Sequence, residues 1–299
     1  MPDTGEHPAK DIAGRTDEKD ISVRADGHEG ASPLIEAQGL GFHHPGGRWL
    51  FLGLDLSLQA GEVLAILGPN GCGKSTLLDV LLDIHRPQEG QVRKQATCSF
   101  VPQFFTPPFA YSVLDIVLMG RSTHIQTFGT PSPQDVAIAR QALADLGIDD
   151  LARRDFAQLS GGQRQLVLAA RALATEAPIM LLDEPTSALD VHNQDRLLTL
   201  LHRLSRERGL TILFTTHQPN HALAVAHKTL LMTQPQARFG PTATVLTVDN
   251  LKQLFDIDMI RLPAQFNGQR FENIMPVYAT QLGACHERIH PPTDPESVG

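Results

Sequence analysis

The feature that most constrains this chain is a glycine-rich segment that follows an apolar run and precedes a helical pattern. The run Val63-Leu64-Ala65-Ile66-Leu67 has the composition of a buried strand, and residues 74–82 have helical periodicity. The segment matches G-x-x-x-x-G-K-[ST], in which backbone N–H groups and the positive end of a helix dipole face a phosphate. A purely structural glycine-rich turn is the alternative, and the flanking strand and helix favour phosphate binding. The segment consists of Gly68, Pro69, Asn70, Gly71, Cys72, Gly73, Lys74, Ser75 and Thr76.

Two side chains of this segment carry the predicted chemistry. In loops of this pattern the lysine, here Lys74, reaches the β and γ phosphates of a nucleoside triphosphate. The hydroxyl of the next residue, Ser75, holds Mg²⁺. The segment therefore predicts a site for a nucleoside triphosphate and its magnesium ion.

A pair of carboxylates follows a second buried run. Residues 179–182 are all apolar, and Asp183 and Glu184 come directly after them. Sheets in α/β proteins place their ligands at the carboxyl ends of the strands, so we expect both acids at the site. Asp183 is the candidate to bind Mg²⁺ through water, and Glu184 is the candidate general base that polarises the attacking water. Two acids after a strand also commonly cap a helix, but the phosphate-binding segment favours the catalytic interpretation.

Composition and charge exclude several classes of protein. Apolar residues make up 41% of the 299 residues and charged residues 19%, as in a globular protein. A formal net charge of −8 disfavours nucleic acid as the main partner. No apolar run is long enough to cross a bilayer, and the N-terminus has no secretory pattern. The cysteines and histidines lack the spacing of a disulfide framework or of a metal site beyond Mg²⁺. We expect a cytosolic protein that acts at a membrane only through a partner.

Strands and helices alternate along most of the chain. Residues 34–60 contain two segments of alternating apolar and polar residues, as in half-buried antiparallel strands. Residues 178–182 and 211–215 read as buried strands, and a helix is predicted to begin at Pro133 with Ser132 as its cap. This alternation predicts an α/β fold around a parallel sheet.

The two ends of the chain differ from its middle. In residues 1–33 acidic residues outnumber basic ones two to one and large apolar residues are scarce, which predicts a disordered acidic tail. Near the other end, alternation at residues 242–246 predicts a strand, and a short helix is expected at residues 250–255. The last dozen residues contain several prolines and are expected to be disordered.

Another motif, Leu159-Ser160-Gly161-Gly162-Gln163, narrows the function. Alone, it predicts a helix start capped by Ser160, whose hydroxyl and neighbouring N–H groups also form an anion site. With the preceding motifs, the chain resembles the nucleotide-binding subunit of ATP-binding cassette (ABC) transporters over residues 34 to about 260. In that family Ser160, Gly161, Gly162 and Gln163 would bind the γ-phosphate of ATP held by the other protomer of a head-to-tail homodimer.

The resemblance assigns three further site residues. Gln103 resembles the glutamine that senses Mg²⁺ and the attacking water, and Asp190 belongs to a loop that crosses the dimer interface. His217 resembles the switch histidine that contacts the γ-phosphate, although a lone histidine after a strand is more often structural. The fold implied is a RecA-like P-loop NTPase core with an antiparallel β-subdomain and a helical subdomain at about residues 104–165. Residues 261–299 would form a C-terminal extension.

One position departs from the family pattern. ABC ATPases carry an aromatic residue, usually tyrosine, that stacks on adenine near the end of the first strand, and the aligned residue here is His44. We expect the imidazole to stack on adenine more weakly than a phenol ring does. The alternative is that His44 faces solvent and that Phe42, or no residue, stacks on the base.

The stretch after Gln103 indicates the kind of transporter. Three phenylalanines and a tyrosine between residues 104 and 111 would grip a membrane permease, with core packing as the alternative. Residues 113–121 resemble those of iron-chelate, haem and cobalamin importers, and residues 122–125, 159–166 and 215–220 look most like molybdate/tungstate importers. The resemblance implies an ATPase on the cytoplasmic face of the inner membrane. It would serve a permease dimer and a periplasmic or surface substrate-binding protein.

Two other classes of protein remain to be compared. Cassette ATPases without a membrane partner usually fuse two cassettes or insert a coiled coil, and this chain has one cassette and no coiled coil. A small-molecule P-loop kinase does not explain the motif at residues 159–163. Both are therefore less favoured than the importer.

Overall fold

The computed structural model describes residues 32–126, 129–233, 236–278 and 280. The expectations of disorder in the acidic tail and in the last dozen residues concern segments outside these ranges, apart from residues 32–33. The described residues all belong to one compact unit. Within the described ranges, no helix combines the length and the apolar character needed to cross a membrane.

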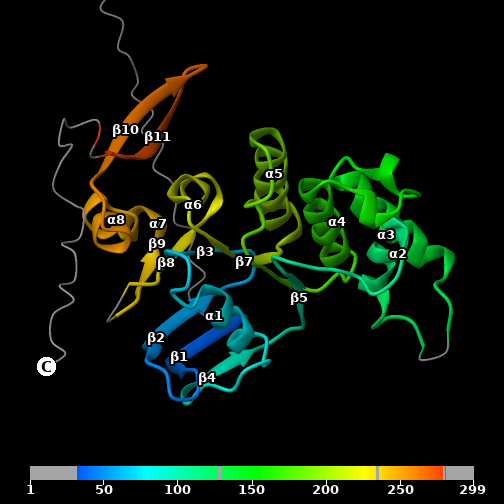
Figure 1. The fold of residues 1–299 in the computed structure, drawn as a ribbon, viewed down its shortest axis with the longest axis horizontal. Helices are drawn as coiled ribbons and strands as arrows, with labels where there is room; N and C mark the ends of the chain where they lie inside the picture. Colours follow the sequence, from blue (N-terminus) through cyan, green and yellow to red (C-terminus); the bar gives the residue numbers. More distant parts are fainter. Residues whose placement is uncertain (1–31, 127–128, 234–235, 279, 281–299) are drawn as a thin grey trace, which may run out of the picture. The chain divides into compact units, whose positions relative to one another are not determined.

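A six-stranded sheet forms the centre of this unit (Figure 1). In spatial order its strands are β5 (Cys98–Val101), β6 (Ile179–Leu182), β7 (Thr211–Thr216), β3 (Val63–Leu67), β8 (Lys228–Leu231) and β9 (Arg238–Pro241). The first five are parallel to one another, and β9 is antiparallel to β8. Every residue of β3, β6 and β7 is buried, which explains why β3 and β6 read as continuous apolar runs in the sequence and β7 as an apolar run between threonines.

The two faces of this sheet pack into separate cores. Side chains of β3 alternate between them, since Val63, Ala65 and Leu67 belong to one core and Leu64 and Ile66 to the other. The first core includes residues of α5 (Val191–Arg208), α6 (Pro219–Val225) and α8 (Val248–Phe255), and the second includes those of α1 (Lys74–Leu81). The sheet is thus covered on both faces, as the predicted α/β fold requires.

The predicted antiparallel subdomain is confirmed, with one strand more than expected. β1 (Ile35–His43) pairs with β2 (Trp49–Leu58) on one side and with β4 (Glu89–Lys94) on the other. The sequence of β4, Glu-Gly-Gln-Val-Arg-Lys, is almost entirely polar, and most of its residues are exposed. It therefore lacks the apolar pattern by which a strand is predicted.

The helical subdomain consists of three helices, α2 (Val113–Leu118), α3 (Pro133–Asp145) and α4 (Gly161–Leu173), which pack against one another (Figure 1). Each helix begins with a capping box. The hydroxyl of a serine before the helix accepts a hydrogen bond from the N–H of the third helical residue, and the side chain of that residue accepts one from the N–H of the serine. The predicted start of α3, with Ser132 as cap and Pro133 in the first turn, is confirmed. The helix α4 extends eight residues past the expected limit at 165. Three short 3₁₀ turns complete the subdomain, η1 (Met119–Arg121), η2 (Asp149–Leu151) and η3 (Phe156–Gln158).

The C-terminal part differs from the sequence prediction. The strand expected at residues 242–246 is wrong, because α7 (Thr242–Val245) is a helical turn. Its first side chain is buried, and the Thr242 hydroxyl donates to Ala226 O, so a tertiary contact overrides a short alternating pattern. The helix α8 agrees with the prediction. An unpredicted hairpin follows, β10 (Met259–Phe266) and β11 (Gln269–Pro276), and the expected boundary at residue 260 falls inside β10.

Candidate active site

The three predicted motifs meet because three neighbouring parallel strands deliver them. The phosphate-binding loop follows β3, Asp183 follows β6, and His217 follows β7, which lies between the other two. Carboxyl ends of parallel strands lie at one edge of a sheet, where α/β proteins bind their ligands. The topology of the sheet therefore brings together the residues that the motifs single out.

Lys74 is held by the loop that precedes it. Its side chain is 6% exposed, and its ammonium donates to Gly68 O at 2.8 Å and to Pro69 O at 3.1 Å. Gly73, at the start of α1, has a φ of 101°, which L side chains rarely adopt. The ammonium of Lys74 also lies 3.1 Å from Glu184 Oε1, an ion pair whose geometry is not that of a hydrogen bond.

The carboxylate of Glu184 lies between two basic side chains. Besides the Lys74 contact, Glu184 Oε2 lies 2.9 Å from His217 Nδ1. Glu184 is 6% exposed, whereas the His217 side chain is 46% exposed. The backbone of Glu184 has a φ of 48°, an uncommon conformation for a residue with a side chain. These contacts fix the direction in which the carboxylate points.

Thr215 joins the two carboxylate residues to β7, and the sequence analysis missed it. Its hydroxyl donates to Asp183 Oδ1 at 2.7 Å and accepts the N–H of Glu184 at 2.7 Å. Both Thr215 and Asp183 are buried, so these bonds satisfy groups that water does not reach. The only signal in the sequence was a threonine near the end of the strand Thr211–Thr216, whose first and last residues are threonines as well.

A second connection also escaped the sequence analysis. The Thr186 hydroxyl lies 3.2 Å from His221 Nδ1, and both side chains are buried. Burial lowers the pKa of His221, the neighbouring His217 lowers it further, and Glu184 opposes both effects. Because Thr186 is two residues from Glu184, this contact links α6 to the candidate base.

Six of the nine residues of the phosphate-binding segment line one cavity of about 500 Å³. His44 lies at this cavity together with Gln103, although the two residues come from different subdomains. The ring of His44 is exposed and makes an edge contact with Phe42, with ring centroids 5.3 Å apart. The lining residues are His44, Leu50, Asn70, Gly71, Gly73, Lys74, Ser75, Thr76, Gln103 and Glu184.

Gly68, Pro69 and Cys72 are the residues of the phosphate-binding segment that do not line this cavity. A Cβ added to Gly68 would lie within 3.2 Å of both Cys72 Sγ and Met232 Cβ. Burial raises the pKa of the Cys72 thiol. Its side chain therefore packs under the loop, and only its backbone remains available to a phosphate.

The residues Ser160 to Gln163 do not line the cavity. They form the N-terminus of α4, where the Ser160 hydroxyl accepts the N–H of Gln163 at 3.3 Å. Gly162 lies against Ala188, because a Cβ there would be 3.3 Å from its carbonyl oxygen. Asp190 caps α5 by accepting the N–H of Asn193 at 2.8 Å. The motif at residues 159–163 therefore lies against the loop that contains Asp190. Neither segment lines the cavity beside the phosphate-binding loop of the same chain.

Comparison with known proteins gives a consistent result. The family model for ABC transporters matches residues 51–187. The molybdate import ATP-binding protein MolC of Haemophilus influenzae is 52% identical over 83% of this chain and 98% of its own length. The iron(3+)-hydroxamate import ATP-binding protein FhuC of Bacillus subtilis is 37% identical over 75% of this chain and 87% of its own length.

Solved structures agree with these relatives. A chain from a structure described as an inward-facing ABC transporter of the metal-chelate type has 50% identity and a TM-score of 0.79, over 83% of this chain and 99% of that one. An ATP-binding cassette in a dimeric, post-hydrolysis state with ADP and phosphate has 26% identity and a TM-score of 0.63, over 70% and 99% of the two chains. Together with the P-loop, the strand-end carboxylates and the Ser160 motif, these matches show that the chain belongs to the ABC transporter family and is one of its ATPases.

Proposed function

We propose that this chain is the ATP-hydrolysing subunit of an importer for molybdate or tungstate. The observation that carries this proposal is the 52% identity to a molybdate import ATP-binding protein over nearly the whole of that relative. The geometry of the site supports the hydrolytic part, because a buried carboxylate lies beside the P-loop lysine and a histidine.

The residues at the cavity would have different roles in ATP hydrolysis. Lys74 would bind the phosphates, and Glu184 would take a proton from the attacking water, oriented by the contact between Oε2 and His217. Ser75, Gln103 and Asp183 offer the hard oxygen ligands that Mg²⁺ prefers, and they lie at or beside the same cavity. When bound, Mg²⁺ neutralises charge that develops on the phosphates.

A second copy of the chain would complete each site. Ser160, Gly161, Gly162 and Gln163 lie apart from the cavity in their own chain but are exposed or half-buried, and Gln163 N already has the Ser160 hydroxyl as partner. In a head-to-tail homodimer they would reach the γ-phosphate held by the partner, and Asp190 would lie near the contact between the copies. Because Asp190 caps α5, its backbone and the exposed Val191 beside it are the groups available to that contact.

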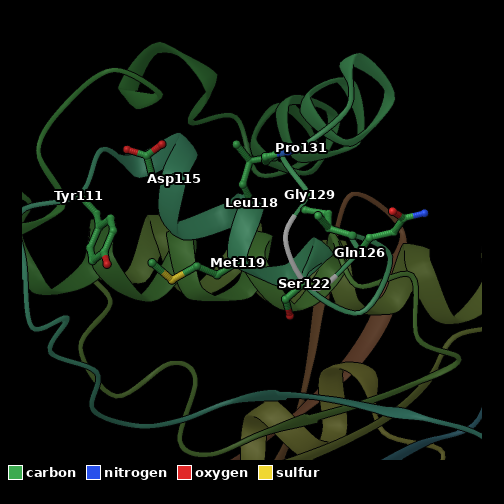
Figure 2. A pocket seen from close by; sticks show the side chains of 9 residues that line it. Tyr111, Asp115, Leu118, Met119, Ser122, Gln126, Gly129 and Pro131 are labelled. Carbon is green, nitrogen blue, oxygen red and sulfur yellow. The ribbon is translucent and has the colours of Figure 1, made fainter.

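The helical subdomain has a groove suited to a membrane permease. Figure 2 shows its lining along α2 and the segment that follows, with Tyr111 and Asp115 at one end, Leu118 and Pro131 in the middle, and Gln126 at the other end. Its volume is about 670 Å³. Close to it along the chain, Phe104 and Phe109 are 83% and 72% exposed. Exposed aromatic side chains beside a groove are typical of a protein interface.

The aromatic stretch after Gln103 serves two purposes in this proposal. Phe105 is half-buried, with its ring 6.0 Å from that of Phe156 and 4.6 Å from the Arg171 guanidinium. It therefore packs the helical subdomain, while Phe104 and Phe109 remain for the permease. The ATPase would be held at the cytoplasmic face of the cell membrane through this contact, and a substrate-binding protein would act on it through the permease.

Import of another metal compound is the second candidate. The relative FhuC, named for iron(3+)-hydroxamate import, and a cobalamin import ATP-binding protein of Halobacterium salinarum, 35% identical over 67% of this chain, favour it. The transported compound would contact the permease and not this subunit, so residues of this chain do not select it.

The test measures ATP hydrolysis by the chain reconstituted with its permease in liposomes. Binding protein loaded with molybdate or tungstate is expected to stimulate hydrolysis, and binding proteins loaded with ferric hydroxamate or cobalamin are not. Stimulation by one of the latter alone would move the assignment to the second candidate. Hydrolysis that never responds to the permease would contradict the importer function altogether.

A further inference from the structure

The loop that carries His217 is attached to a hairpin for which the proposed function gives no role. The helix α6 begins at Pro219, two residues after His217, and it packs against β11 (Figure 1). Besides the contact of His217 with Glu184, three hydrogen-bond contacts that involve side chains hold this loop and the first turn of α6. Gln218 N donates to the Thr216 hydroxyl at 3.0 Å, His221 contacts Thr186, and Asn220 bonds to the hairpin.

The side-chain amide of Asn220 makes the same pair of hydrogen bonds to Ile274 that a peptide group on a neighbouring strand would make. Its Nδ2 donates to Ile274 O at 3.1 Å, and Ile274 N donates to its Oδ1 at 2.8 Å. Ile274 faces Arg261 across the hairpin, and its backbone groups point outward, as those of alternate residues do in an antiparallel pair. The Asn220 amide thus takes the place of a peptide group on a neighbouring strand.

These two bonds lie in a place that water does not reach freely. Ile274 is 4% exposed and belongs to the main core, whereas most residues of the hairpin are exposed. Removing the amide would leave a buried N–H and a buried C=O on β11 without partners, which is unfavourable. Asn220 therefore links α6 to the hairpin through two hydrogen bonds.

We propose that Asn220 is a positioning residue for His217, because it fixes the first turn of α6 on the hairpin β10–β11. The contact between His217 and Glu184 requires the loop at residues 217–218 to stay in place. Two of its supports, Thr216 and Thr186, lie in the core, and the third is the hairpin. This inference rests on the proposed role of His217 in ATP hydrolysis.

The test compares Asn220→Ala with Asn273→Ala. Asn273 is the matched control, because it lies on the same hairpin, is half-buried, and has no side-chain hydrogen bond within the described ranges. We expect Asn220→Ala to lower kcat about tenfold and leave the KM for ATP within about twofold, since two hydrogen bonds of ordinary strength are lost and the phosphate loop is untouched. Asn273→Ala should change neither value.

Histidine NMR separates positioning from loss of folded protein. With ¹⁵N-labelled imidazoles, the His217 signals should shift in Asn220→Ala and stay in place in Asn273→Ala. Asn220→Asp, which keeps the acceptor for Ile274 N but loses the donor to Ile274 O, should give an intermediate kcat. It replaces Asn220→Ala if that variant does not fold.

Three outcomes would overturn the proposal. They are an unchanged kcat in Asn220→Ala, a reduced kcat with unshifted His217 signals, and an equal loss in Asn273→Ala. His217→Ala is measured in parallel to test the underlying function. If that variant hydrolyses ATP at the normal rate, the proposed role of His217 fails, whatever Asn220 does. If it is slow and Asn220→Ala is normal, only the present inference fails.

Discussion

Glu184 uses its two carboxylate oxygens for different partners, Lys74 on one side and His217 on the other. Glu184→Gln keeps the size of the side chain but removes its charge and its ability to take a proton. We expect ATP turnover to fall by at least about a hundredfold, the range for loss of a general base, while ATP binding persists. The variant should accumulate as an ATP-bound dimer in size-exclusion chromatography. The exposed Glu207→Gln is the control, and a monomer with normal turnover would refute the role.

His44 contributes a ring to the cavity beside the phosphate-binding loop, at the position where the family resemblance leads us to expect a tyrosine. Its edge contact with Phe42 leaves the imidazole exposed, so one face is available to adenine. We expect His44→Tyr to tighten ATP binding and His44→Ala to weaken it, by up to the ~1–3 kcal/mol that an aromatic ring gives in base stacking. A fluorescent ATP analogue measures both. Equal affinities for histidine, tyrosine and alanine would exclude stacking.

Among the elements, α3 depends on one carboxylate at its N-terminus. Asp135 accepts bonds from the Ser132 hydroxyl and backbone N–H and from the Arg121 guanidinium. The bonds from Ser132, followed by the one from Arg121, lower the pKa of Asp135 to about 2. Arg121 also donates to Ala174 O at 2.8 Å, so it joins α3 to the end of α4.

This pKa predicts how the stability of the protein depends on pH. An aspartate in the unfolded chain has a pKa of about 3.9, so Asp135 stabilises the folded state above pH 4. That contribution should be lost as the pH falls from about 4 to 2. Asp135→Asn should therefore have a lower unfolding midpoint at pH 7 and a smaller change on acidification. Asp150→Asn, at an exposed position, is the control, and parallel pH curves for the two variants would contradict the prediction.

Elements were predictable from the sequence where their burial leaves a pattern. The strands β3, β6 and β7 are buried on both faces and appear as apolar runs, and Ser132 with Pro133 marks the start of α3. The strand β4 is polar and left no such pattern. For the hairpin β10–β11 the sequence did contain a signal, the pair Asn267-Gly268, which is typical of a two-residue hairpin turn. Both residues have the positive φ that such a turn requires.

At the scale of the molecule, sequence motifs predict which residues gather but not the contacts that hold them. Topology alone brings Lys74, Asp183 and His217 to one sheet edge, because their strands are neighbours. The bonds of Thr215 to the carboxylate segment depend on the register between β6 and β7, which no motif records. The same is true of Asn220, whose partner lies far away in the sequence.

The separation of Ser160 from the cavity leads to a prediction about two copies of the chain. Ser160→Arg should block one half of each site and Lys74→Ala the other half. In a mixture, each heterodimer would contain one site with both halves intact, so activity should return to a fraction of the wild-type rate. The measurement is the rate of phosphate release as a function of the ratio in which the two chains are mixed. A mixture as inactive as either parent would contradict the head-to-tail arrangement.

The contacts of Lys74 imply an order of events. An ammonium has three donors, and here two are taken by Gly68 O and Pro69 O while the third side faces Glu184. A phosphate that approached from this side would take the place of the carboxylate beside the ammonium. The exchange would separate Glu184 from Lys74 when the phosphate arrives. In the proposed mechanism Lys74 would therefore act as an interlock, because Glu184 would be released as a base only once a phosphate is bound.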